Sequence, residues 1–295
     1  MNEYLIDKAR VRASFDRAAS TYDAAAVLQA EVRSRMMSRL ELVKLAPKVI
    51  LDAGCGTGHA SVELMKRFAA SRVISLDLAW GMLQQTKASQ HWLKRTLGLM
   101  PQSLLCADIE NLPLQSDSVD VIWSNLAVQW CNDLDQVFTE TERVLQPGGL
   151  LMFSTFGPDT LKELRQAASA DPNHVHVSRF IDMHDIGDAL VRAGYSAPVL
   201  DVEHFVLTYD DVLGVMRDLK AIGAHNAAAG RNKGLQGKGF LTKLTQNYEH
   251  FRKDGKLPAT FEVVYGHAWK PETSRAEPSS HSLNGSMPIT IHRRT

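Results

Sequence analysis

The chain has 295 residues, enough to bury a full hydrophobic core as one large domain or as a domain with an insertion. Its 33 basic and 33 acidic residues balance, which argues against a molecule-wide nucleic-acid-binding surface. Its three cysteines form no C-x-x-C pair, so the sequence indicates neither a disulfide framework nor a zinc site.

The sequence also lacks the marks of a secreted or membrane protein. No stretch approaches the roughly 20 apolar residues that a membrane-spanning helix needs, and the first residues contain no apolar signal region. We therefore expect a cytoplasmic protein without membrane contact.

The first half of the chain predicts two helical segments followed by alternating strands and helices. Residues 4–18 and 24–46 have the apolar spacing of helices. Strands are expected at 48–52, 72–76, about 102–107, 119–124 and 150–155, and helices at about 59–69, from about 79, and at about 133–145. This alternation is typical of an α/β fold with a doubly wound, mostly parallel sheet.

The second half departs from strict alternation. Helices are expected at 158–170, 182–194, 210–222 and 238–253, and strands at 199–208 and 260–268. The two late strands would complete a seven-stranded sheet, and the helices between them would cover a ligand.

This pattern divides the chain into three parts. Residues 1–46 are expected to form N-terminal helices that act as a lid. Residues 47–270 are expected to form the main domain, with helical insertions at about 156–196 and 210–256. The tail at 271–295 has few large apolar residues, and its composition predicts disorder.

A strand that runs into glycines at every second position is the most informative local pattern. Gly54, Gly56 and Gly58 follow an apolar strand that ends at Asp52. Side chains at these glycines would block a ligand lying against the main chain there. The dinucleotide fingerprint is G-x-G-x-x-G, and Asp52 would repel a pyrophosphate but suit a cationic ligand. The pattern resembles the first motif of class I S-adenosylmethionine (SAM) methyltransferases and disfavours a nicotinamide dehydrogenase.

Polar side chains end four predicted strands, where ligands of α/β sheets bind. Asp52 ends the first strand. Asp77 ends the second, where a carboxylate can accept both hydroxyls of a ribose. Asp108 ends the third and can accept from an adenine amino group beside the apolar Ile109. Asn125 ends the fourth, next to the expected position of the reactive methyl group.

These considerations define a predicted SAM site and its methyl side. The cofactor-binding candidates are Phe15, Tyr22, Asp52, Gly54, Cys55, Gly56, Gly58, Asp77, Leu78, Met82, Asp108, Ile109, Asn125 and Leu126. Tyr22, Asn125 and Gln129 are the candidates on the methyl side, and no residue stands out as a certain catalytic group. Phe15 and Tyr22 are seven residues apart and belong either to a core-facing stripe or to a lid over the cofactor.

Several longer stretches carry a more specific resemblance. Residues 15–23, 51–58, 125–130, 156–164, 218–226 and 258–269 resemble the malonyl-[acyl-carrier protein] O-methyltransferase (BioC) family of biotin synthesis. The resemblance covers about residues 5–270 and implies a class I, Rossmann-like methyltransferase fold. It implies SAM as methyl donor, S-adenosyl-L-homocysteine as product, and a malonyl thioester as acceptor. The resulting methyl ester would start pimeloyl synthesis for biotin.

The implied reaction makes few demands on acid–base groups. A carboxylate is already ionised at pH 7, so its methylation needs no general base. Alignment and exclusion of water would carry the catalysis. An arginine fork suits a free carboxylate best, and the candidates in the inserted region are Arg179, Arg192, Arg217 and Lys220.

Charge is unevenly distributed along the chain. Residues 217–256 contain mostly basic charged side chains, which favours docking of an acidic acyl carrier protein over an ordinary solvated surface. Coenzyme A is the alternative carrier of the malonyl group. Nucleic acid is disfavoured because few aromatic residues lie between the basic ones.

Two other interpretations share the SAM motifs. The first is another class I methyltransferase, such as a quinone C-methyltransferase or a small-acid O-methyltransferase. The second is a non-catalytic SAM-binding scaffold that has lost its acceptor pocket. Only the lid distinguishes the first alternative from a malonyl methyltransferase. The intact polar strand ends argue against the second, and only turnover excludes it.

Overall fold

A seven-stranded sheet forms the centre of the computed structural model, which describes residues 5–97, 103–168, 180–222 and 238–272. Its strands lie in the order β3-β2-β1-β4-β5-β7-β6. β1 to β5 run parallel, whereas β7 is antiparallel to both β5 and β6. The strands are β1 (Val49–Ala53), β2 (Arg72–Asp77), β3 (Ser103–Cys106), β4 (Val119–Asn125), β5 (Leu145–Phe156), β6 (Ser196–Tyr209) and β7 (Leu257–Trp269). The predicted doubly wound, mostly parallel fold is confirmed.

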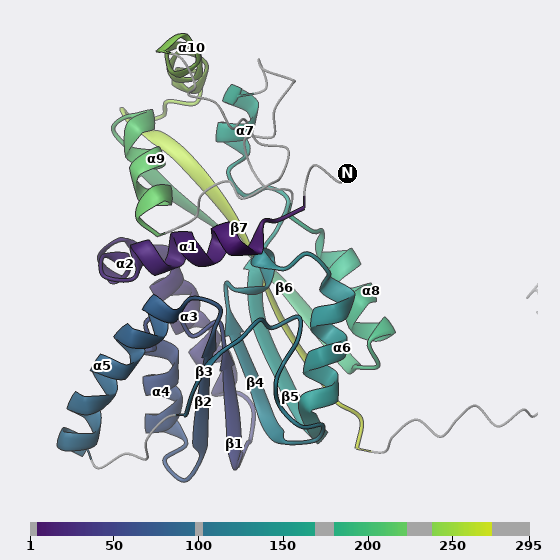
Figure 1. Ribbon diagram of the computed structural model, residues 1–295. Coiled ribbons are helices and arrows are strands. Elements are labelled where there is room, and N and C mark those ends of the chain that lie inside the picture. The colour runs from purple at the N-terminus through teal and green to yellow at the C-terminus, as the bar shows by residue number, and fades with distance from the viewer. Residues whose placement is uncertain (1–4, 98–102, 169–179, 223–237, 273–295) are drawn as a thin grey trace, which may run out of the picture.

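Helices flank the sheet and extend beyond one end of it (Figure 1). They are α1 (Lys8–Ala18), α2 (Tyr22–Ala25), α3 (Val27–Leu40), α4 (His59–Arg67), α5 (Trp80–Leu97), the 3-10 turn η1 (Val128–Trp130), α6 (Leu134–Val144), α7 (Lys162–Ala168), α8 (Met183–Arg192), α9 (Val212–Ala221) and α10 (Lys238–Glu249). Figure 1 shows α1 crossing above the sheet, with α7, α9 and α10 beyond it. No helix among the described residues is both long and apolar enough to cross a membrane.

The sheet separates two hydrophobic cores because successive strand residues point to opposite faces. Ile50 belongs to one core together with Met36 of α3 and Leu64 of α4. Its neighbour Leu51 belongs to the other core, together with Phe138 of α6. All five of these side chains are almost fully buried. The buried strands therefore give the loops at their carboxyl ends a rigid base.

Two predicted boundaries differ from the structure for local reasons. The helix expected over 24–46 forms α2 and α3, which are separated at Ala26, where φ is −82° and ψ is 41°, and α3 ends at Leu40. The helix expected at 158–170 begins only at Lys162. A turn precedes it, in which the Thr160 amide donates to the Gly157 carbonyl at 3.1 Å. The tail prediction falls largely outside the described residues.

The middle of β7 requires a residue without a side chain. A Cβ on Gly266 would lie 2.5 Å from Cε1 of Phe153 and 2.8 Å from Cδ2 of Leu200. We expect Gly266→Ala to lower the free energy of unfolding by about 1–3 kcal/mol, the usual cost of overpacking a core. Gly239→Ala on α10 is the matched control, because a Cβ there meets no atom within 4 Å. Urea denaturation that gave equal stabilities for the two variants would contradict this packing role.

Candidate functional site

A cavity lies under α1, at the carboxyl ends of the parallel strands and next to the point where the strand order reverses between β1 and β4. It contains about 840 Å³ of space, including its mouth. We call it the inner cavity. Eleven of the predicted cofactor residues line it: Phe15, Tyr22, Gly54, Gly56, Asp77, Leu78, Met82, Asp108, Ile109, Asn125 and Leu126. Gln129, the remaining methyl-side candidate, lines it too.

A side pocket adjoins the inner cavity at the glycine turn. The two share Tyr22, Gln29, Gly54, Gly56 and Asn125, and the predicted residues Asp52 and Cys55 line the side pocket. Gly58 lines neither of them.

The three glycines of the turn serve different purposes. All have positive φ, at +81° for Gly54, +55° for Gly56 and +89° for Gly58. A Cβ on Gly54 would overlap Ala127, and one on Gly58 would lie 2.7 Å from Cγ2 of Thr86. A Cβ on Gly56 would meet no atom within 4 Å. The expectation that all three glycines make room for a ligand is therefore met only at Gly56, while the other two permit close packing.

Asp52 lies beneath the turn and is 1 % exposed. The Ser61 hydroxyl donates to its Oδ2 atom and also lies 2.7 Å from the Ser75 hydroxyl. Asp52 Oδ1 and Gln29 Oε1 are buried without a hydrogen-bond partner among the described residues. Burial raises the pKa of Asp52 to about 7. Two acceptor oxygens without donors suit a ligand group that carries positive charge and N–H bonds.

Asp77 ends β2 and holds the turn from the other side. Its Oδ2 accepts from the Gly56 amide at 2.9 Å, and its Oδ1 accepts from the Ala79 amide at 2.8 Å. Burial raises the pKa of Asp77 to about 6, and these backbone hydrogen bonds oppose the shift. The carboxylate is thus fixed at the cavity wall, where the sequence predicted a partner for ribose hydroxyls.

Helix α1 is attached to the rim of the inner cavity at both of its ends. At its start, the Lys8 ammonium lies 2.9 Å from an Asp108 oxygen and 2.5 Å from a Glu110 oxygen. Near its end, Asp16 Oδ1 accepts from the Gly81 amide at 2.7 Å. The helix therefore covers the cavity, as expected of a lid, and it holds Asp108 through an ion pair that the sequence did not reveal.

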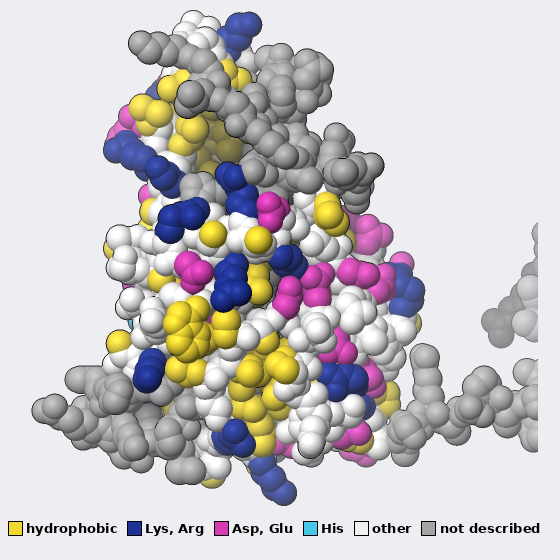
Figure 2. Space-filling view, in the orientation of Figure 1, with side chains coloured by type: hydrophobic (Ala, Val, Ile, Leu, Met, Phe, Trp, Pro, Cys, Tyr) yellow, Lys and Arg dark blue, Asp and Glu magenta, His cyan; other side chains and the backbone are white. Residues whose placement is uncertain are grey.

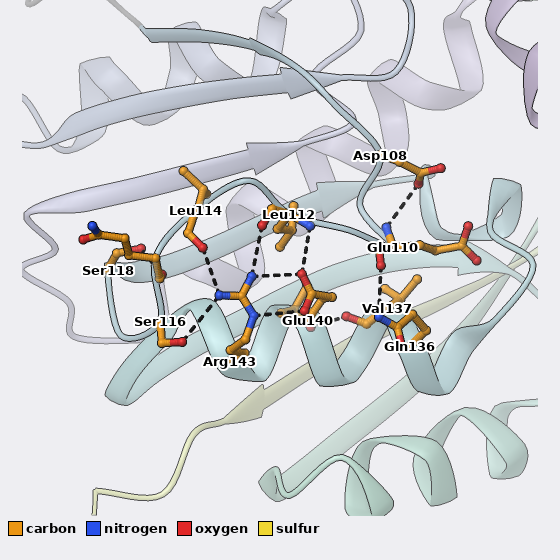
Figure 3. A network of polar contacts seen from close by, with 12 residues as sticks. Asp108, Glu110, Leu112, Leu114, Ser116, Ser118, Gln136, Val137, Glu140 and Arg143 are labelled. Atoms are coloured by element: carbon orange, nitrogen blue, oxygen red, sulfur yellow. Dashed lines mark hydrogen bonds and ion pairs between the residues drawn. The ribbon is translucent and has the colours of Figure 1, made fainter.

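A network of hydrogen bonds from α6 also positions the loop that carries Asp108 (Figure 3). Arg143 on α6 donates to the backbone carbonyls of Leu112 at 3.0 Å and Leu114 at 2.9 Å. It also binds both carboxylate oxygens of Glu140, which in turn accepts from the Leu112 amide at 2.9 Å. The pKa of Glu140 is lowered by its hydrogen bonds with Arg143. Sequence analysis missed this pair, because its spacing within one helix matches an ordinary surface ion pair.

Aromatic side chains form the wall between α1 and η1. Phe15 contacts Tyr22 edge-to-face with ring centroids 6.4 Å apart, and it contacts Trp130 at 5.4 Å. Burial raises the pKa of the Tyr22 hydroxyl well above its usual value. Tyr22 is therefore a neutral side chain at neutral pH, suited to shaping the cavity rather than to accepting a proton.

The two amides predicted for the methyl side are held in place by hydrogen bonds. Asn125 donates to the Gln29 carbonyl at 3.1 Å and accepts from the Ser154 hydroxyl at 3.0 Å. Gln129 donates to the Leu126 carbonyl at 2.6 Å. Both amides therefore line the cavity in fixed orientations.

The predicted carboxylate-binding cations do not meet at this cavity. Arg192 is 58 % exposed and pairs with Asp135 at 2.8 Å. Arg217 is 75 % exposed and lies 3.8 Å from Asp211, and Lys220 is exposed on α9. None of these three lines the inner cavity or the side pocket, and Arg179 lies outside the described residues. The sequence placed these charges in the inserted region but contained no information on which way they face.

Comparison with known proteins supports a methyltransferase fold. The family described as "Methyltransferase domain" matches residues 51–153. A putative methyltransferase from Bacillus halodurans C-125 shares the fold, with a TM-score of 0.58 at 17 % identity over 81 % of this chain and 98 % of its own.

Relatives of much higher identity carry one name. The malonyl-[acyl-carrier protein] O-methyltransferase of Methylovorus sp. (strain MP688) is 68 % identical over 95 % of this chain and 94 % of its own length. The protein of the same name from Gallionella capsiferriformans (strain ES-2) is 58 % identical over 92 % of this chain and 93 % of its own. The chain therefore belongs to the malonyl-[acyl-carrier protein] O-methyltransferase family.

Proposed function

We propose that this protein transfers the methyl group of SAM to the free carboxylate of a malonyl group carried as a thioester on acyl carrier protein. The observation that carries the proposal is its 68 % identity, over nearly the whole chain, to a relative of that name. The inner cavity and side pocket supply residues whose chemistry suits SAM.

The residues of the two cavities match the parts of SAM in turn. Asp77 would accept from the ribose hydroxyls, and Asp108 from the adenine amino group, beside the buried apolar side chain of Ile109. The unpartnered oxygens of Asp52 and Gln29 would accept from the ammonium group. The open space at Gly56 would admit the ligand close to the main chain. This assignment satisfies the buried acceptors that the protein itself leaves unpaired.

Bound SAM supplies a methyl group on a positively charged sulfur, and a carboxylate oxygen bonds to that carbon as the carbon–sulfur bond breaks. The protein then has to align the two reactants and exclude water. The fixed amides of Asn125 and Gln129 and the neutral ring of Tyr22 would shape this part of the cavity. No proton acceptor is required, because the attacking carboxylate is ionised at neutral pH.

The attachment of α1 predicts a slow exchange of cofactor. We expect Lys8→Met to speed the dissociation of SAM by about 3- to 30-fold, because the lid loses charge-assisted bonds to Asp108 and Glu110. Stopped-flow displacement of bound cofactor would measure this rate. Lys44→Met, which removes an exposed lysine between α3 and β1, is the matched control. Equal dissociation rates in the two variants would rule out a role of the Lys8 ion pairs in retaining the cofactor.

The proposed docking face for an acidic carrier protein extends beyond the stretch 217–256 to the lid. In the stretch 217–256, Arg252 is engaged by Glu249 at 2.6 Å, and Lys256 is engaged by Asp210 at 2.5 Å. Figure 2 shows basic side chains gathered around the level of α1. The outer surface of α1 carries the exposed Arg10, Arg12 and Arg17, which form no ion pair among the described residues. We therefore include α1 in the proposed docking face.

Mass spectrometry of malonyl-[acyl-carrier protein] after incubation with the protein and SAM tests the proposed function. Malonyl-coenzyme A, free malonate and a quinone serve as competing acceptors. A gain of one methyl group on the carrier-bound malonyl, faster than on the other acceptors, is the expected result. Methylation of the quinone alone would replace the proposal with the C-methyltransferase alternative. SAM binding without transfer to any acceptor would leave a non-catalytic scaffold.

A further inference from the structure

A third cavity adjoins the inner cavity on the far side of Gln129 and Phe156. We call it the outer cavity. It is lined by Thr155, Phe156, Pro158, Arg165, Phe180 and Ile186, among others. Gln129, Cys131 and Phe156 line both the inner and the outer cavity. A group held in the outer cavity thus lies next to the methyl-side candidate Gln129.

Arg165 on α7 is the one basic residue that lines this cavity within the part of the chain that the structure describes. Its Nη2 atom donates to the Pro158 carbonyl, and no carboxylate lies within 4 Å of the guanidinium among the described residues. In contrast, the cations of the other two cavities are already paired, Lys8 with Asp108 and Arg33 with Glu63 at 3.0 Å. Arg165 therefore keeps N–H donors available for an external anion.

Three of the acids around Arg165 and the outer cavity have partners of their own. Glu163 accepts from the Thr260 amide at 3.0 Å, and Asp159 pairs with Lys162 at 2.9 Å. Asp182, at the cavity rim, accepts from the His184 amide at 2.8 Å at the start of α8. Partial burial lowers the pKa of Arg165, a sign that water solvates this cation incompletely. An anionic ligand would supply hydrogen-bond acceptors to the guanidinium of Arg165 in place of water.

The apolar part of the outer cavity suits the rest of a short acyl chain. Phe156 and Phe180 meet edge-to-face with ring centroids 5.6 Å apart, and the buried Ile186 lines the same cavity. An arginine fork binds a carboxylate through two parallel hydrogen bonds, which fixes its orientation as well as its position.

We propose that Arg165 binds the free carboxylate of the acyl thioester substrate in the outer cavity; this inference rests on the proposed function. Of the earlier candidates, Arg192, Arg217 and Lys220 do not line this cavity either, and Arg179 lies outside the described residues. Methylation neutralises the carboxylate, so the ester loses its pairing with the guanidinium and is released. Arg165 thus distinguishes the acid from its own methylated product and from neutral acyl thioesters.

The test compares Arg165→Gln and Arg165→Lys with the wild-type enzyme, using malonyl-[acyl-carrier protein] as methyl acceptor. We expect Arg165→Gln to raise the KM for this acceptor by about 10- to 100-fold, the usual loss for a charge-assisted pair, while SAM affinity stays unchanged. Arg165→Lys is expected to recover part of the loss. Acetyl-coenzyme A should inhibit Arg165→Gln as well as it inhibits the wild type, because it offers no carboxylate. Arg192→Gln, which removes an exposed arginine outside the cavities, is the matched control.

The outcomes separate this inference from the proposed function. If the wild type methylates malonyl-[acyl-carrier protein] and Arg165→Gln has the same KM for it, the proposed role of Arg165 is wrong and the proposed function stands. Absence of transfer by the wild type overturns both. If neither variant folds, the rate at which phenylglyoxal modifies Arg165 in the wild-type protein is measured instead of the KM. Protection by malonyl-coenzyme A but not by acetyl-coenzyme A supports the proposal, and equal protection refutes it.

Discussion

Replacing Asp52 with Asn is expected to stabilise the ligand-free protein above pH 7 and at the same time to weaken its binding of SAM. The folded protein raises the pKa of this carboxyl from 3.8 to about 7 through burial. The native state therefore binds the proton more tightly than the unfolded chain does. The contribution of Asp52 to stability is fully present below about pH 4 and is lost as the pH rises through about 7. The full shift corresponds to about 4 kcal/mol.

Asn preserves the shape of Asp52 and can still accept from Ser61 through its carbonyl oxygen. It removes the charge, and with it the fall in stability between about pH 4 and pH 7. SAM affinity should rise with pH through about 7 in the wild type, because the ionised carboxylate attracts the cationic ligand. The variant should lack this rise.

Urea denaturation and calorimetric titration with SAM, each at pH 5 and pH 8, measure both effects. Asp188→Asn is the control, because Asp188 is an exposed carboxyl on α8. If Asp52→Asn kept the wild-type dependence of stability on pH, then burial of this carboxyl does not control it.

The second large effect is expected at Gly56. Asn tolerates the left-handed backbone that φ of +55° requires, so Gly56→Asn should fold. Its side chain would enter the open space at the glycine turn, which we propose that the cofactor occupies. We expect SAM to bind about 10- to 100-fold more weakly, since overlap in a packed site costs about 1–3 kcal/mol or more.

Gly255→Asn provides a closely matched control for Gly56→Asn. Gly255 also has positive φ, at +76°, and a Cβ there meets no atom within 4 Å, but it lies outside the three cavities. Thermal denaturation should give similar losses of stability for the two variants, while only Gly56→Asn loses cofactor affinity. Equal affinity in both would mean that the space above Gly56 is not used.

The mostly parallel sheet and the convergence of polar residues at its carboxyl edge were predictable from the sequence, because they depend on local patterns. Apolar runs that end in Asp52, Asp77 and Asn125 specify parallel strands, and the carboxyl ends of such strands meet by the geometry of the fold. Thus eleven predicted residues converge on one cavity although they come from separate segments of the chain.

Contacts between distant segments were not predictable. The overlap at Gly58 involves Thr86 on another helix, and nothing near Gly58 in the sequence indicates it. Arg165 became a candidate only after the structure placed it on a cavity shared with Gln129. Periodicity identifies the buried face of a helix, but it does not reveal what that face meets or which exposed charge turns inward.

The position of β7 has a consequence for the order in which the enzyme forms. β7 is the last strand of the sheet in sequence, yet it lies between β5 and β6. Its residues Val264 and Val263 pair with Thr155 and Phe156 of β5, which line the outer cavity. During synthesis β5 therefore remains an edge strand until almost the whole sheet has been translated. An unpaired edge strand is prone to aggregation. The outer cavity is therefore among the last parts of the protein to form, and a nascent chain that stalls before β7 lacks one wall of it.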